Sequence, residues 1–199
     1  MRLVLDWDGT VTERDTLDLV LEEFGEAQVY EGAEAELEAG RMTLNEVIAA
    51  EFAAVTAPLD EVVAHVLDHA RVRPGFAELA RSWHPLVVSS GFRELIEPVL
   101  EREGVLQAVE LRANSVEARP DGWRVDFRVA ETCDECGEAC KRADLPDGDA
   151  VYAGDGHSDY CAALAAGRVY ATGSLARYLE RRGVAFTPLT DFYRLASEL

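Results

Sequence analysis

Hydrophobic residues form short runs near both ends of the chain and follow a helical spacing between them. The run RLVLD at residues 2–6 predicts a short buried strand. From Thr16 to Arg71, apolar residues recur every three or four positions among Ala, Glu and Leu, which predicts about four helices and no strand. Gly40 and Pro58 interrupt this helical segment, as turn residues do.

Beyond residue 73 the pattern alternates between strand and helix. Pro74-Gly75 begins a predicted helix, HPLVVSSGF reads as a buried strand ended by small residues, and the next helix ends at Gly104. Residues 109–129 alternate apolar and polar around Pro120-Asp121-Gly122, which predicts a β-hairpin. Strand, turn and helix follow in DAVYAGDGHSDYCAALAAG, then a strand VYATG and helices LARYLERRG and DFYRLASEL.

This alternation predicts an α/β fold with a doubly wound, Rossmann-like parallel sheet. The helical segment is placed just after the first strand, as an insertion. We therefore expect an α/β core of residues 1–13 and 74–199, a helical cap of residues 14–73, and a hairpin attached to the core.

Composition narrows the possible partners. The chain has 199 residues, 48% hydrophobic and 29% charged, which suits one globular domain with a modest insertion. Its net charge of −19 disfavours nucleic acid or an anionic membrane as partner, since both attract basic surfaces. No apolar run approaches the ~20 residues of a membrane span, and no signal peptide is apparent, so we expect a cytoplasmic protein.

Acidic residues follow two of the predicted strands. Asp6 and Asp8 follow the first, and Asp155 and Asp159 follow the strand that precedes GDG. Ligands of open parallel sheets bind beyond the carboxyl ends of the strands, so neighbouring strands would bring these four carboxylates into one crevice. Such a cluster needs a cation, and Mg²⁺ is the natural candidate because it prefers oxygen ligands.

Simpler interpretations exist for each motif alone. An isolated Asp-x-Asp-Gly is usually a solvated turn or a helix cap, and GDG is ordinary turn chemistry. An EF-hand is excluded, because it would require glycine at Val11 and glutamate at Leu17. The functional interpretation gains weight because each motif follows an apolar strand. Ser89, Ser90 and Gly91, after the PLVV strand, would add hydroxyl and backbone N–H donors for a phosphate group.

Together these motifs resemble the haloacid dehalogenase (HAD) superfamily of phosphatases. DWDGTVT is similar to its first motif, PLVVSSGF to its second, Lys141 to its third and GDGHSD to its fourth, and the helical insertion lies where C1 caps are found. Within the phosphoserine phosphatase-like branch, VLDHARVRPGF, SSGFRELIEPVL, the cysteines before Lys141 and DFYRL look like the methionine-salvage group. That group dephosphorylates a hydroxy-keto-methylthiopentenyl phosphate.

The resemblance implies a role for each site residue. Asp6 would be the nucleophile and Asp8 the general acid and base, while Ser89 and Lys141 bind the phosphoryl group. Mg²⁺, the implied cofactor, would be held by the metal ligands Asp6, Asp8 (through its carbonyl), Asp155 and Asp159. The implied substrate-binding residues are Asp15, Ser89, Ser90, Gly91 and Lys141.

Some positions depart from phosphoserine phosphatases. Ser90 replaces a glycine of the second motif, Asp15 stands in place of a cap glutamate, and VIAAEFAAV lacks the arginine expected to bind a substrate carboxylate. We therefore rank a neutral, small-molecule phosphate ester above phosphoserine. The alternatives are phosphoserine phosphatase, a HAD phosphotransferase, and an inactive regulatory or binding protein. The sequence leaves a monomer and a homodimer both open.

Three cysteines precede Lys141 in the segment TCDECGEACK. Cys133, Cys136 and Cys140 have a spacing compatible with zinc, but reduced thiols are the favoured interpretation because no fourth ligand is evident. Cys161 is distant in the sequence and is expected on a helix.

Overall fold

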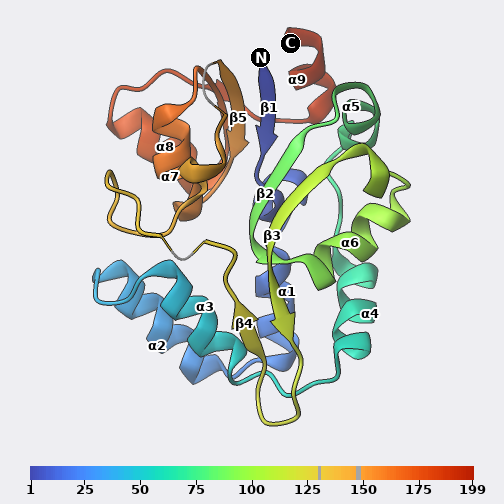
Figure 1. The fold of residues 1–199 in the computed structure, drawn as a ribbon, viewed down its shortest axis with the longest axis vertical. Helices are drawn as coiled ribbons and strands as arrows, with labels where there is room; N and C mark the ends of the chain where they lie inside the picture. The colour runs from blue at the N-terminus through green and yellow to red at the C-terminus, as the bar shows by residue number, and fades with distance from the viewer. Residues whose placement is uncertain (130, 147–148) are drawn as a thin grey trace.

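The structure is a computed structural model that describes residues 1–129, 131–146 and 149–199. At its centre lies a seven-stranded sheet with the order β4-β3-β2-β1-β5-β6-β7 (Figure 1). Its strands are β1 (Arg2–Leu5), β2 (Leu86–Phe92), β3 (Glu110–Glu117), β4 (Arg124–Asp126), β5 (Ala150–Gly154), β6 (Arg168–Ala171) and β7 (Thr187–Pro188). All neighbouring strands pair in parallel except β3 and β4, which are antiparallel.

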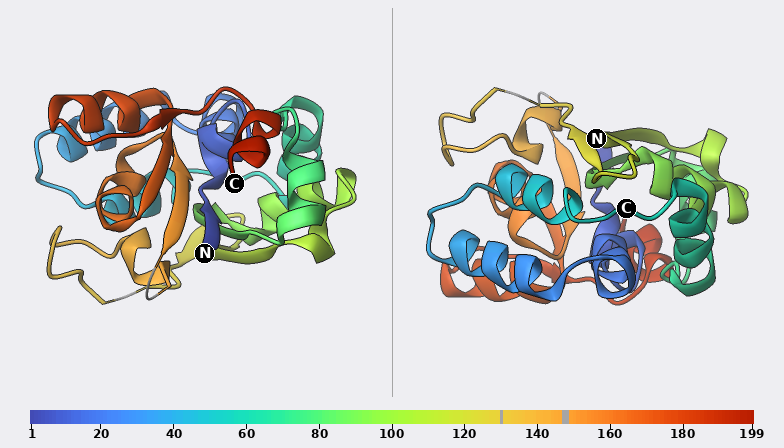
Figure 2. Two further views of the ribbon diagram at one scale, coloured as in Figure 1. Left: turned by 90° about the horizontal axis from the view of Figure 1, so that it is seen from above. Right: turned by 90° about the horizontal axis from the view of Figure 1, so that it is seen from below.

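Helices cover both faces of this sheet. Along β1, Leu3 and Leu5 pack into one apolar cluster and Val4 packs into the other, as the period of two in a strand requires. The helices of the core are α5 (Phe76–Trp83), α6 (Arg93–Arg102), α7 (Tyr160–Ala165), α8 (Gly173–Arg181) and α9 (Phe192–Glu198). Helices α5, α6 and α9 lie on one face, and α7 and α8 on the other (Figures 1 and 2). The predicted doubly wound α/β fold is confirmed.

Four helices of the described residues lie between β1 and α5 in the chain, and we call them the helical block. They are α1 (Thr16–Phe24), α2 (Ala27–Glu38), α3 (Leu44–Phe52) and α4 (Leu59–His69). Local sequence defines their ends: Asp15 caps α1 through its side chain, and Thr43 forms a capping box with Glu46 at α3. Helices α1 to α3 lie beyond the carboxyl ends of β1 and β2, while α4 runs beside α6 (Figure 1).

The two chain segments that join the helical block to the core lie side by side. Thr12 and Val72 form an antiparallel bridge. The backbone N–H of Glu13 donates to the Arg71 carbonyl at 2.9 Å, and that of Arg73 donates to the Val11 carbonyl at 2.8 Å. These bonds place the entry and the exit of the block at one short neck.

The hairpin of β3 and β4 also contacts the helical block. Trp123 is buried, and its backbone N–H lies 3.1 Å from the Phe52 carbonyl and 3.0 Å from the Val55 carbonyl. Its indole N–H donates to the Ala57 carbonyl at 2.9 Å. Gly122 has a φ of +117°, and a Cβ there would lie 2.1 Å from the Ala53 carbonyl oxygen, so only glycine fits.

Two strand boundaries differ from the sequence prediction. The first strand ends at Leu5, because Trp7–Val11 form a tight turn. The strand β2 continues past the small residues to Phe92, which pairs with Asn114 of β3 after a register shift beyond Val88. The small side chains therefore leave β2 extended, with an irregularity at the level of the serines.

Glu51 is a carboxyl group buried in the helical block. It is 5% exposed, and its Oε1 atom has no hydrogen-bond partner among the described residues. Burial, and then the charges of Glu34 and Asp18, raise its pKa to about 8. Because this pKa lies above the value in the unfolded chain, stability is lost as the pH rises from the unfolded pKa through about 8.

We therefore predict that Glu51→Gln, which imitates the neutral form, reduces the loss of stability at high pH. Between about pH 5 and about pH 9 the Tm of the wild type should fall more than that of the variant, by at least about 2 °C. Thermal unfolding followed by circular dichroism measures this difference. The exposed Glu101→Gln on α6 is the control, and parallel Tm curves for Glu51→Gln and wild type would show that Glu51 is not the group responsible.

Candidate active site

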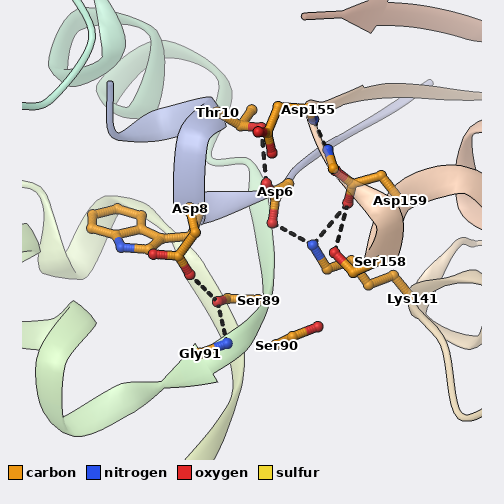
Figure 3. Close-up of polar contacts among 12 residues, drawn as sticks. Asp6, Asp8, Thr10, Ser89, Ser90, Gly91, Lys141, Asp155, Ser158 and Asp159 are labelled. Atoms are coloured by element: carbon orange, nitrogen blue, oxygen red, sulfur yellow. Dashed lines mark hydrogen bonds and ion pairs between the residues drawn. The ribbon is translucent and has the colours of Figure 1, made fainter. Parts of the chain in front are cut away.

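Two carboxylates follow β1 but have different partners (Figure 3). Asp6 is 3% exposed, accepts a hydrogen bond from the Thr10 hydroxyl at 2.8 Å, and forms an ion pair with the Lys141 ammonium group. Trp7, between the two aspartates, is fully buried and packs edge-on against Phe76. The tight turn thus directs the indole into the core and leaves both carboxylates at the carboxyl end of the strand.

Asp8 joins the core to the helical block. One carboxylate oxygen accepts hydrogen bonds from the backbone N–H of Thr16, at 2.9 Å, and from its hydroxyl. The other accepts from the Ser89 hydroxyl at 3.1 Å. Burial raises the pKa of Asp8, although the Thr16 and Ser89 hydrogen bonds oppose the shift. Asp8 is therefore better suited than an ordinary surface aspartate to hold a proton.

Two glycines make room for these carboxylates. Gly9 has a φ of +70°, and a Cβ at this position would lie 2.3 Å from an Asp155 carboxylate oxygen. A Cβ at Gly91 would lie 2.9 Å from an Asp8 carboxylate oxygen. The glycines of the first two motifs therefore allow segments from three strands to approach closely.

The loop after β5 is held by Asp159, which is fully buried. One of its carboxylate oxygens accepts from the backbone N–H of Asp155 at 2.8 Å and of Gly156 at 3.0 Å. The other accepts from the Tyr152 hydroxyl at 2.6 Å and from Lys141 Nζ at 2.8 Å. Asp159 thus fixes both the loop and the lysine.

Lys141 lies between Asp6 and Asp159 and is 2% exposed. Burial alone would lower its pKa, but the Asp159 and Asp6 charges outweigh that effect and raise it. Lys141 is also the only lysine of the chain, in which every other basic side chain except histidine is arginine. A compact ammonium fits between two buried carboxylates where a planar guanidinium would not.

A cavity of about 510 Å³ opens beside this cluster. Ser89, Ser90 and Lys141 line it from the core, Asn114 and Arg128 from the hairpin side, and Leu44 and Asn45 from the helical block. This volume suits a small organic molecule.

Comparisons with known proteins identify the family. The family model described as haloacid dehalogenase-like hydrolase matches residues 3–164. The chain belongs to this HAD-like hydrolase family. The family resemblance seen in the sequence is thereby confirmed, and with it the expectation of a hydrolase.

Relatives of this HAD-like hydrolase include proteins named 2-hydroxy-3-keto-5-methylthiopentenyl-1-phosphate phosphatase. The one from Exiguobacterium sibiricum is 26% identical, with 100% of this chain and 96% of the relative covered. The one from Geobacillus thermodenitrificans is also 26% identical, with coverage of 99% and 94%. A solved phospho-aspartyl intermediate analogue of phosphoserine phosphatase has a TM-score of 0.70 at 17% identity, covering 99% of this chain and 97% of its own.

The carboxylates of the HAD-like hydrolase fit a divalent cation. Oxygens of Asp6, Asp155 and Asp159 all lie within 4.8 Å of one another. Burial and then the Asp159 charge raise the pKa of Asp6 well above its usual value, and the same two causes raise that of Asp155 to about 6. Three crowded carboxylates face the single charge of Lys141, and Mg²⁺ accepts such oxygen ligands. Asp159 already accepts hydrogen bonds from more donors than Asp6 or Asp155, so it has the least remaining capacity to bind a cation directly.

The remaining predicted site residues occupy different positions. The Gly91 N–H donates to the Ser89 hydroxyl at 2.8 Å, and the Ser90 carbonyl accepts from the Asn114 amide at 2.8 Å. The Asp15 carboxylate accepts from the Leu17 N–H at 2.7 Å as the cap of α1. A substrate contact for Asp15, Ser90 or Gly91 therefore stays a prediction.

Sequence reasoning missed several residues that support the site. Thr10, Thr16, Tyr152 and Asn114 each hydrogen-bond a predicted site residue or its backbone. Thr10 is part of the quoted DWDGTVT motif, and its hydroxyl four residues after Asp6 was an available signal. No helix among the described residues is long and apolar enough to cross a membrane.

Proposed function

We propose that this HAD-like hydrolase cleaves the phosphate group from a small-molecule phosphomonoester, with Mg²⁺ as cofactor. The observation that carries the proposal is the buried cluster of Asp6, Lys141, Asp155 and Asp159 beside a cavity. The relatives named as phosphatases and the phosphoserine phosphatase fold support it.

In this proposal Asp6 attacks phosphorus in line with the ester oxygen. A bond forms between an Asp6 oxygen and phosphorus while the bond to the ester oxygen breaks, and Asp8 donates a proton to the departing alkoxide. Asp8 then takes a proton from water, which attacks the aspartyl-phosphate, releases inorganic phosphate and regenerates Asp6. The raised pKa of Asp8 supports its role as a proton donor.

The charged phosphoryl oxygens need nearby positive charge and hydrogen-bond donors. Lys141 provides a fixed ammonium group, and the Ser89 hydroxyl is a donor from β2. Asp6, Asp155 and the Asp8 carbonyl would hold Mg²⁺, with Asp159 binding through water. When bound, the cation neutralises the carboxylates and the phosphoryl charge.

The helical block is proposed to be the cap over this site, spanning residues 14–73. The block is joined to the core at the short neck formed by Thr12 and Val72. Its first helix also contacts the site directly, because the Thr16 backbone N–H donates to the Asp8 carboxylate. In this arrangement, closure over bound substrate would exclude bulk water from the reaction.

We further propose a methionine-salvage enol phosphate as the substrate, with phosphoserine as the second candidate. The names of the full-length relatives favour the first. Asp15 and Asp18 of the helical block lie near Asp8, and burial and then the Asp8 charge raise the pKa of both, so this side of the site is negative. Such a field disfavours the carboxylate of phosphoserine. The proposed setting is cytoplasmic, with the protein a monomer or homodimer.

A panel of phosphorylated metabolites, assayed with and without Mg²⁺, tests the proposal. We expect the enol phosphate to be hydrolysed at least about tenfold more efficiently than phosphoserine, which corresponds to about 1.4 kcal/mol. Removing divalent cations should abolish the activity, and adding Mg²⁺ should restore it. A strong preference for phosphoserine would reverse the ranking. No release of phosphate from any ester, including a chromogenic one, would favour the inactive binding protein.

A further inference from the structure

Four cysteines come together beside the active site. Cys133, Cys136 and Cys140 precede Lys141, and Cys161 lies in the first turn of α7. Their sulfur atoms all lie within 4.8 Å of one another, and all four are free thiols. The fold therefore brings a fourth cysteine, Cys161, to the three that precede Lys141.

The sulfur separations fall in the range that a tetrahedral metal site requires. Zinc–sulfur bonds of about 2.3 Å place the sulfurs of a tetrahedron about 3.8 Å apart. The sulfurs of Cys133 and Cys161 are 3.9 Å apart, close to that value and far beyond the ~2.05 Å of a disulfide. A disulfide would also leave the other two thiols of the cluster unexplained.

The backbone around Cys133 is folded as a compact turn. The Gly137 N–H donates to the Cys133 carbonyl at 2.9 Å, and the Cys133 N–H donates to the Glu138 carbonyl at 2.9 Å. Gly137 has a φ of +77°, which glycine adopts without strain. The turn thus presents the first two sulfurs together.

We propose that Cys133, Cys136, Cys140 and Cys161 bind one Zn²⁺ as four thiolates, in a structural site separate from the carboxylate cluster. Four protein ligands leave no open position for a substrate, which is typical of structural zinc. Arg142, which lines the cavity together with Cys140 and Cys161, offsets part of the negative charge of such a centre. Binding would release the thiol protons.

The proposed zinc site lies next to Lys141 in the sequence and would stabilise the segments that carry it. Cys140 immediately precedes Lys141, and Cys161 follows Asp159 by two residues. A zinc ion would therefore fasten together the two segments that carry the Lys141–Asp159 ion pair. Cys136 and Cys140 also line the cavity, so the ion would stabilise one of its walls.

Metal content tests the proposal directly. The full chain, purified without chelator, is expected to contain about one zinc per chain by mass spectrometry. Exchange for Co²⁺ should give the intense visible absorption of tetrahedral cobalt and a thiolate-to-cobalt charge-transfer band. Cys136→Ser and Cys161→Ser should each weaken zinc binding at least about tenfold. Asp134→Asn, in the same turn, is the matched control and should keep the metal.

If a cysteine variant does not fold, measurements on the wild-type protein are sufficient to test the proposal. Zinc well below one per chain, together with no cobalt spectrum after reduction and metal addition, would overturn the proposal. So would two missing thiols when the denatured, unreduced chain is titrated with a thiol reagent, because that result indicates a disulfide. None of these readouts uses phosphatase activity, so they remain valid even if the proposed reaction is wrong.

Discussion

Asp6→Asn is expected to abolish phosphatase turnover, lowering kcat by at least about 10⁴-fold. Asparagine has the shape of aspartate but cannot form the acyl-phosphate bond that the proposed mechanism requires. Steady-state release of phosphate measures the loss. In an acid-quenched single turnover, the wild type should also carry protein-bound phosphate that hydroxylamine removes, and the variant should carry none.

This variant should stay folded. Lys141 keeps its ion pair with Asp159, and an asparagine oxygen still accepts the Thr10 hydrogen bond at the same position. Asp68→Asn, at an exposed position on α4, is the matched control and should have wild-type kcat. A fully active Asp6→Asn enzyme, or protein-bound phosphate in that variant, would remove Asp6 as the nucleophile.

Lys141→Met is the second large effect that we expect. It removes the fixed positive charge from the phosphoryl site, and losing one such electrostatic contact typically costs about 10²–10³-fold in kcat. It also leaves Asp6 and Asp159 buried without their partner, and breaking a buried ion pair typically costs about 3–5 kcal/mol of folding stability. Kinetics and thermal unfolding of the same preparation measure the two losses separately.

Lys141→Arg separates charge from shape. Arginine keeps the charge, but its planar guanidinium does not fit a position that is 2% exposed between two carboxylates, so we expect kcat to remain at least about tenfold below wild type. If both variants lose stability but keep kcat, Lys141 is an anchor of the fold and takes no part in phosphoryl binding.

The sequence was most informative where chemistry follows a strand. Asp6 and Asp155 could be predicted to converge because β1 and β5 are buried apolar runs, and parallel neighbours end at the same edge. Their partners could not be predicted, since Tyr152 and Thr16 reach the carboxylates through side-chain directions that depend on packing. No local pattern distinguishes these residues from ordinary core positions.

Contacts between residues that are far apart in the sequence could not be predicted either. Cys161 lies 28 residues from Cys133 but 3.9 Å away between sulfur atoms, because α7 packs against the turn Lys141–Asp144 that follows the other cysteines. The extent of β2 was also missed, since Ser89, Ser90 and Gly91 read locally as the end of a strand. Pairing of Phe92 with β3 keeps that segment extended.

The bonds from Trp123 to the turn between α3 and α4 give the proposed cap a further attachment, besides the two crossings at its neck and the packing of α4 beside α6. If the cap moves, the β3–β4 hairpin must move with it, because Trp123 bonds the hairpin to the cap. Bending would then concentrate in β3, between its parallel pairing with β2 and its antiparallel pairing with β4. The entrance used by substrate would accordingly widen on the side away from the hairpin.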